Sequence, residues 1–260
     1  MKDSPMQRRK FIQICAVGAA AGTGCGASFN ACADAKTPSV AGDVAPAKKT
    51  GVVIKPKNYA RVKLVDLEGR AIKAKSLKAN HNYVFNYPFE STPCFLLNLG
   101  REIKGSTELV TEKGESYIWP GGVGSKKSVV AYSAICAHKL AYPSSQVSFI
   151  SYRDKPSPLS PKGNVIGCCA DKSAYDPFSG AKVLGGPAPQ PLATILLEHD
   201  PKTDEIYVVG TFGGEKFDEF FKKYEFKLSL EPGGDRAKEQ VTTTAVLRDL
   251  SAHSAQTAQC

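Results

Sequence analysis

Cys136-Ala137-His138 is followed, after 29 residues, by Cys168-Cys169-Ala170-Asp171-Lys172-Ser173-Ala174-Tyr175-Asp176. Each stretch is short and places a second metal-binding side chain two or three positions after a cysteine. Thiolate and imidazole are ligands that suit an iron–sulfur cluster or zinc. The spacing therefore predicts two loops that close around one metal centre from opposite sides.

The cysteine count supports a metal centre over a disulfide framework. The chain has 260 residues and eight cysteines, of which five lie beyond residue 33. An odd number is a poor fit to a simple set of disulfides. Thiol catalysis is also disfavoured, because Cys136 and His138 stand two positions apart with no third group to orient them as a nucleophile and its base.

The body of the chain is predicted to be β. Short runs of β-branched and aromatic residues, separated by Gly, Pro, Asp and Ser clusters, are typical of an antiparallel sandwich. The runs cover residues 52–67, 82–87, 95–99, 128–132, 147–152, 165–167, 195–198 and 206–209. Only residues 216–227 have helical spacing, with aromatic residues at i, i+3, i+4 and i+7 that we expect to dock on the sandwich. After Pro232 the chain is polar, which predicts a loosely packed tail.

Residues 1–33 have the layout of an export signal. Gln7-Arg8-Arg9-Lys10-Phe11 precedes a short apolar run of small residues, and Ala31-Cys32-Ala33 is the predicted cleavage site. The paired arginines resemble the twin-arginine (Tat) signal, by which bacteria export folded proteins, often with a cofactor inserted. We therefore expect a periplasmic protein. An uncleaved signal, or a lipid on Cys25 or Cys32, would anchor it to the membrane. Residues 34–50 are predicted to be a flexible linker.

The charge of the chain indicates the kind of partner. Charged residues make up 23% and the formal net charge is +9. The balance of charged and hydrophobic residues is that of a folded globular protein. The basic excess suits an acidic partner surface, and the sequence does not indicate a nucleic-acid groove.

The pattern of the two loops resembles the Rieske [2Fe–2S] family, and in particular the arsenite oxidase small subunit type. The matching pattern is Cys-x-His, then Cys-x-x-(His)-x-Ser-x-Tyr-Asp, then Gly185-Gly186-Pro187-Ala188-Pro189. The runs at 87–88, 93–97, 121–124 and 130–136 are also similar. The resemblance implies an antiparallel β-sandwich over residues 51–212, with a cluster-binding subdomain inserted at about 133–191. Residues 213–260, the helix and tail, lie outside it.

The resemblance implies a [2Fe–2S] cluster bound by Cys136, His138, Cys168 and Asp171. Asp171 stands where the family has its second histidine, and the neighbouring Cys169 is an alternative fourth ligand. Ser173 and Tyr175 match the hydroxyls that donate hydrogen bonds to a cluster sulfur and a ligand thiolate.

The family also implies a function. We expect single-electron transfer as a subunit or partner of a larger redox enzyme. The electron-transfer partner could instead be a cytochrome-type protein. Catalysis by this chain alone is not implied. Ala141 and Ala170 occupy the places where many Rieske proteins carry a disulfide between the two loops. Zinc in the same site, or a structural and docking subunit without a cluster, remain the alternatives.

Overall fold

The central strands of the large sheet are buried on both faces. In the computed structural model, which describes residues 49–231 and 234–260, β3 (Pro93–Asn98) pairs with β6 (Val129–Ser133), and every residue of β6 is buried. Side chains alternate between the two faces of a strand. Leu96 and Ala131 accordingly belong to one hydrophobic cluster, while Phe95 and Tyr132 belong to another. One sheet therefore separates two cores.

The large sheet has eight strands in the order β14-β1-β13-β12-β6-β3-β2-β15. Its other strands are β1 (Lys57–Val65), β2 (Tyr83–Asn86), β12 (Thr194–His199), β13 (Ile206–Phe212), β14 (Thr244–Val246) and β15 (Arg248–Asp249). All neighbours run antiparallel except β1 and β14, which are parallel. Because β14 also contacts β2, the sheet curls around the first of the two cores.

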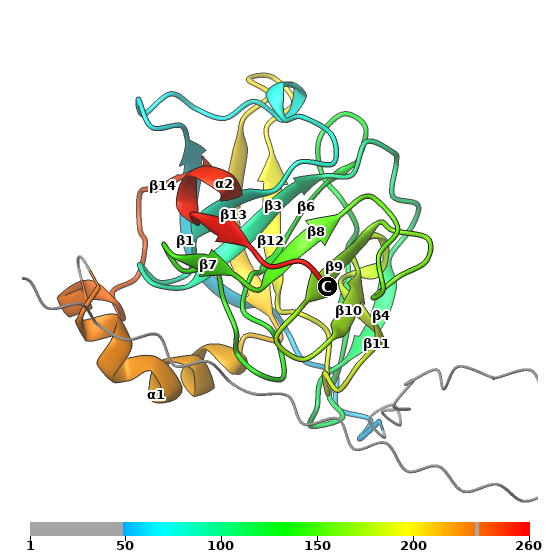
Figure 1. Cartoon of the computed structure of the whole chain (residues 1–260). Helices are drawn as coiled ribbons and strands as arrows, with labels where there is room; N and C mark the ends of the chain where they lie inside the picture. The colour runs from blue at the N-terminus through cyan, green and yellow to red at the C-terminus, as the bar shows by residue number, and fades with distance from the viewer. Residues whose placement is uncertain (1–48, 232–233) are drawn as a thin grey trace, which may run out of the picture. The chain divides into compact units, whose positions relative to one another are not determined.

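A smaller sheet is inserted between two neighbouring strands of the large one. It has the order β11-β10-β9-β8 and consists of β8 (Ile150–Arg153), β9 (Val165–Cys168), β10 (Ser173–Asp176) and β11 (Lys182–Gly185). All four strands lie in the sequence between β6 and β12, which pair with each other through Tyr132 and Thr194. The structure thus confirms an all-β fold with an inserted subdomain (Figure 1).

Two further strand pairs complete the β structure. In the first, β4 (Thr107–Val110) pairs with β5 (Ser116–Trp119). In the second, β7 (Val147–Ser148) runs parallel to β16 (Gln256–Thr257). The buried side chains of β4 and β5, including Trp119, pack in the second core together with those of the smaller sheet.

The helix expected over 216–227 is present as α1 (Lys216–Ser229). Its aromatic face docks as predicted, because Phe217, Phe220 and Phe221 are buried in the first core. Phe220 meets Tyr142 edge to face, with ring centroids 5.0 Å apart. Since Tyr142 follows the first ligand loop, this contact brings α1 close to the candidate metal centre.

The C-terminal segment differs from the prediction of a loosely packed tail. Ala245, Leu247, Leu250 and Ser254 are buried, and the short helix α2 (Leu250–His253) follows β15. The polar composition of the segment concealed this order, because its backbone hydrogen bonds go to strands far away in the sequence: β14 pairs with β1, β15 with β2 and β16 with β7.

The predicted signal (1–33) and all but two residues of the predicted linker lie outside the described residues. Thr50, at the described end of the linker, donates its main-chain N–H to the carbonyl of Gly114 at 2.9 Å. Within 49–231 and 234–260, no helix combines the length and apolar character needed to cross a membrane.

Candidate metal centre

The second ligand loop is the turn of a β-hairpin. Cys168 ends β9, Ser173 begins β10, and the two residues face each other across the ladder. Residues 169–172 make the connection, with Lys172 in the left-handed region at φ 62°. The N–H of Ser173 donates to Asp171 Oδ1 at 3.0 Å. This bond, typical of aspartate in turns, holds the Asp171 carboxylate in one orientation.

The first ligand loop begins directly after β6. Cys136 donates its N–H to the carbonyl of Ala141 at 2.9 Å and accepts from the N–H of Leu140 at 3.0 Å. Leu140 has φ 58°, so the chain reverses tightly there. The reversal leaves the Cys136 side chain buried and turns His138 towards the surface.

The predicted donor atoms converge. Those of Cys136, Cys168 and Asp171 all lie within 4.8 Å of one another, which makes the three a group that could hold a metal ion. The Cys136 Sγ lies 3.2 Å from Asp171 Oδ2. His138 reaches the group through the same oxygen, with its Nδ1 at 3.1 Å. Two loops that are 29 residues apart therefore bring three donors together, with His138 bonded to one of them.

Two hydroxyl groups, those of Ser173 and Tyr175, lie close to the donors. The Tyr175 hydroxyl is 3.4 Å from the Cys136 Sγ and accepts the N–H of Ala137 at 3.2 Å. The Ser173 hydroxyl is buried and has no hydrogen-bond partner among the residues that the structure describes. A buried hydroxyl without a partner is costly, so Ser173 retains a donor for a group bound next to it.

The protonation of the site follows from burial and from its short contacts. Burial raises the pKa of Tyr175 well above its ordinary value, so its hydroxyl keeps its proton and can donate. The hydrogen bond shared by the two thiols lowers the pKa of Cys136 and raises that of Cys168. Burial opposes ionisation of Asp171, but the Ser173 N–H and the two thiols still hold its pKa below the ordinary value.

A glycine-containing loop closes over the second ligand loop. Gly186 has φ 85°, and a Cβ there would stand 2.5 Å from both the Lys172 carbonyl oxygen and the Ser173 Cα. Only glycine allows the two backbones to approach so closely. The run 185–189 therefore contacts the ligand loop through Gly186.

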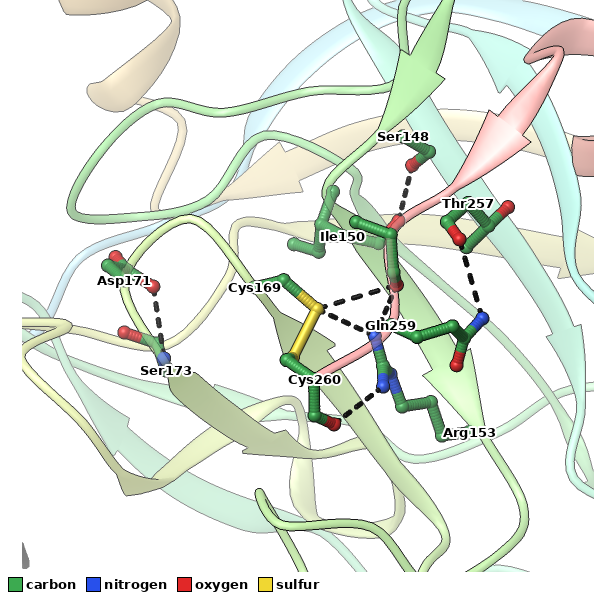
Figure 2. The surroundings of a disulfide bond; sticks show 10 residues. Ser148, Ile150, Arg153, Cys169, Asp171, Ser173, Thr257, Gln259 and Cys260 are labelled. Carbon is green, nitrogen blue, oxygen red and sulfur yellow. Dashed lines mark hydrogen bonds between the residues drawn. A yellow bond between two sulfur atoms is a disulfide. The ribbon is translucent and has the colours of Figure 1, made fainter. Parts of the chain in front are cut away.

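Cys169, the alternative fourth ligand, forms a disulfide with Cys260 (Figure 2). Its sulfur is therefore not available to a metal in this structure, whereas the Asp171 carboxylate lies in the donor group. The free thiols among the described residues are Cys94, Cys136 and Cys168. Cys94 is buried and bonds to the carbonyl of Tyr87 at 2.9 Å, away from the donor group.

The structure adds Arg153 to the residues around the site. Its guanidinium donates to the Ala258 carbonyl at 2.7 Å, to the Cys260 carbonyl at 3.1 Å and to the Cys169 Sγ at 2.8 Å. No motif in the sequence marked Arg153, because its partners lie 16 to 107 positions away. No signal in the sequence marked the disulfide either, because the odd number of cysteines beyond residue 33 argued against a disulfide framework.

Ala141 and Ala170, one from each ligand loop, line the same surface hollow of about 300 Å³. Tyr142 and Tyr224 also line it, together with three lysines. The two alanines are thus brought to one place between the ligand loops and α1.

No protein-family model matches the chain. Among solved structures it is similar to the soluble domain of the Rieske protein II (soxF) from Sulfolobus acidocaldarius, with 29% sequence identity. The likeness covers 59% of this chain and 78% of that chain, with a TM-score of 0.42.

Proposed function

We propose that this chain is an exported Rieske-type electron carrier whose [2Fe–2S] cluster is bound by Cys136, His138, Cys168 and Asp171. The observation that carries the proposal is the convergence of the two thiols, the imidazole and the carboxylate from two separate loops. When bound, such a cluster accepts and releases one electron at a time. The chain's own residues bind it, exclude water from it and set its potential.

The residues around the donors fit this group. A reduced cluster gains negative charge on its sulfur atoms, which hydrogen-bond donors stabilise. Tyr175 is protonated and within reach of Cys136, while the buried Ser173 hydroxyl has a donor to spare. The contact of Gly186 with the loop covers the site on another side.

His138 is the donor through which an electron would enter or leave. Its side chain is 35% exposed, whereas that of Asp171 is 1% exposed and both thiols are fully buried. Lys139 and Lys172, the neighbours of these two ligands in the sequence, are also exposed. A partner with acidic residues at its docking surface would therefore be attracted to this edge.

The decisive experiment is iron and acid-labile sulfide analysis of the exported protein, with its visible absorption spectrum. We expect two irons and two sulfides per chain, and loss of both in Cys136→Ser and in Cys168→Ser. Cys94→Ser is the matched control, since that thiol is equally buried but away from the donors. Full iron occupancy in Cys168→Ser would remove the Rieske interpretation.

Zinc is the second candidate, because three donors within 4.8 Å of one another could all bind a single tetrahedral ion. One zinc per chain without sulfide would favour this structural site. A protein with neither metal would instead be a structural or docking subunit that keeps the fold alone.

Export in folded form is part of the proposal. It rests on Arg8, Arg9 and Phe11, because a cluster inserted in the cytoplasm requires the route for folded proteins. Replacing both arginines with lysine should leave the precursor in the cytoplasm. Normal appearance of that variant in the periplasm would contradict export by the twin-arginine route. The partner is proposed to be a larger redox enzyme or a cytochrome.

A further inference from the structure

The second ligand loop is covalently tied to the C-terminal segment (residues 244–260). Cys169, directly after the ligand Cys168, is bonded to Cys260, which lies 91 positions further along the chain. Figure 2 shows the segment passing beside β8 and β9, with the disulfide at the start of the loop that carries Asp171. The hairpin turn that carries Asp171 is thus anchored at Cys169.

The C-terminal segment is itself firmly attached, so it can serve as an anchor. Its strand β16 pairs with β7, and the N–H of Ala258 donates to the carbonyl of Ser148 at 2.8 Å. Arg153, on β8, then bridges the Ala258 and Cys260 carbonyls and the Cys169 sulfur. The N–H of Cys169 adds a bond to the Phe149 carbonyl at 2.7 Å.

These contacts act on the two ligands of the loop. Cys168 and Asp171 lie one residue before and two residues after Cys169. With Cys169 held on one side and Ser173 held by its pairing with Cys168 on the other, the turn has little freedom to move either donor away. Without the disulfide, a free thiol would also stand next to the ligand thiol, where it could compete for a metal.

We propose that the Cys169–Cys260 disulfide, together with Arg153, is a clamp that holds Cys168 and Asp171 in their ligand positions. Cys169, Cys260 and Arg153 are positioning residues, since none of them is a donor of the site. The proposal rests on the proposed ligand role of Cys168 and Asp171. It extends that role by assigning a function to the C-terminal segment.

The test compares thiol alkylation rates in the full-length purified protein, using iodoacetamide and peptide mass spectrometry. Metal is first removed from wild type and variants with a chelator, because a bound metal would itself protect Cys168. Each free thiol then reacts only when its surroundings open. Cys94 is the internal control, because it is as buried as Cys168 but lies in the other core. In Cys169→Ser/Cys260→Ser, we expect the Cys168 rate relative to Cys94 to rise at least about tenfold, as local opening becomes easier.

Arg153→Lys keeps the disulfide and the charge but loses the forked donor geometry. This variant should raise the Cys168/Cys94 ratio by a smaller factor. It provides the test of the clamp if the double variant does not fold. If alkylation of Cys168 and Cys94 is accelerated equally in the double variant, the disulfide stabilises the whole fold and the clamp proposal is wrong. The proposal is also wrong if the Cys168/Cys94 ratio is unchanged in both variants. Iron analysis of the untreated wild type tests the proposed function separately, because the alkylation ratio is measured on metal-free protein.

Discussion

Removing the Cys169–Cys260 disulfide should destabilise the whole fold as well as the loop. The perturbation is Cys169→Ser/Cys260→Ser. The cross-link joins residues 91 positions apart, and the chain-entropy relation for a loop of that size gives about 4.6 kcal/mol of stabilisation. For a domain of this size, that corresponds to a fall in melting temperature of roughly 9–18 °C. The loss arises mainly in the unfolded chain, because Arg153 and the β16–β7 pairing still dock the segment in the folded state.

The assay is urea unfolding followed by fluorescence of Trp119, the only tryptophan and a buried one. The variant should unfold at lower urea with a larger m-value, since its unfolded chain exposes more surface than the cross-linked one. Cys94→Ser controls for loss of a buried cysteine. A change below about 1 kcal/mol, with the linked peptide detected in the wild type, would refute the entropic reasoning.

Three further predictions concern other parts of the fold. Asp171→His removes a negative charge from the proposed cluster and should raise its reduction potential; a redox titration placing the wild type at or above the variant would exclude aspartate ligation. Gly186→Ala should cost roughly 1–3 kcal/mol of unfolding free energy, because the new Cβ meets the ligand loop at a positive φ, whereas Gly185→Ala, with nothing within 4 Å, should cost less. Hydrogen bonds from a tyrosine and two lysines lower the pKa of Glu205 to about 2, so its stabilising effect is complete above pH 4.5 and is lost as the pH falls towards 2; acid unfolding of Glu205→Gln should lack that part of the pH dependence.

The elements with a clear local pattern could be predicted from the sequence. The strand runs at 95–99, 128–132 and 206–209 became β3, β6 and β13, because alternating or continuous β-branched residues favour strands wherever a core can cover them. The aromatic spacing of α1 likewise indicated both the helix and its buried face. The residue types and spacing of the two loops indicated a metal centre, and the resemblance to the Rieske family implied its ligands; the structure brings Cys136, Cys168 and Asp171 together, with His138 bonded to Asp171.

Other features depend on pairings between distant residues and leave no local pattern. The polar segment 244–257 becomes β14, β15 and β16 only because β1, β2 and β7 offer free edges to it. Cys169 had the residue type of a ligand, yet its sulfur bonds to Cys260 instead. Residue chemistry therefore determined which side chains could bind a metal, whereas the distances set by the folded sheets decided which of them meet.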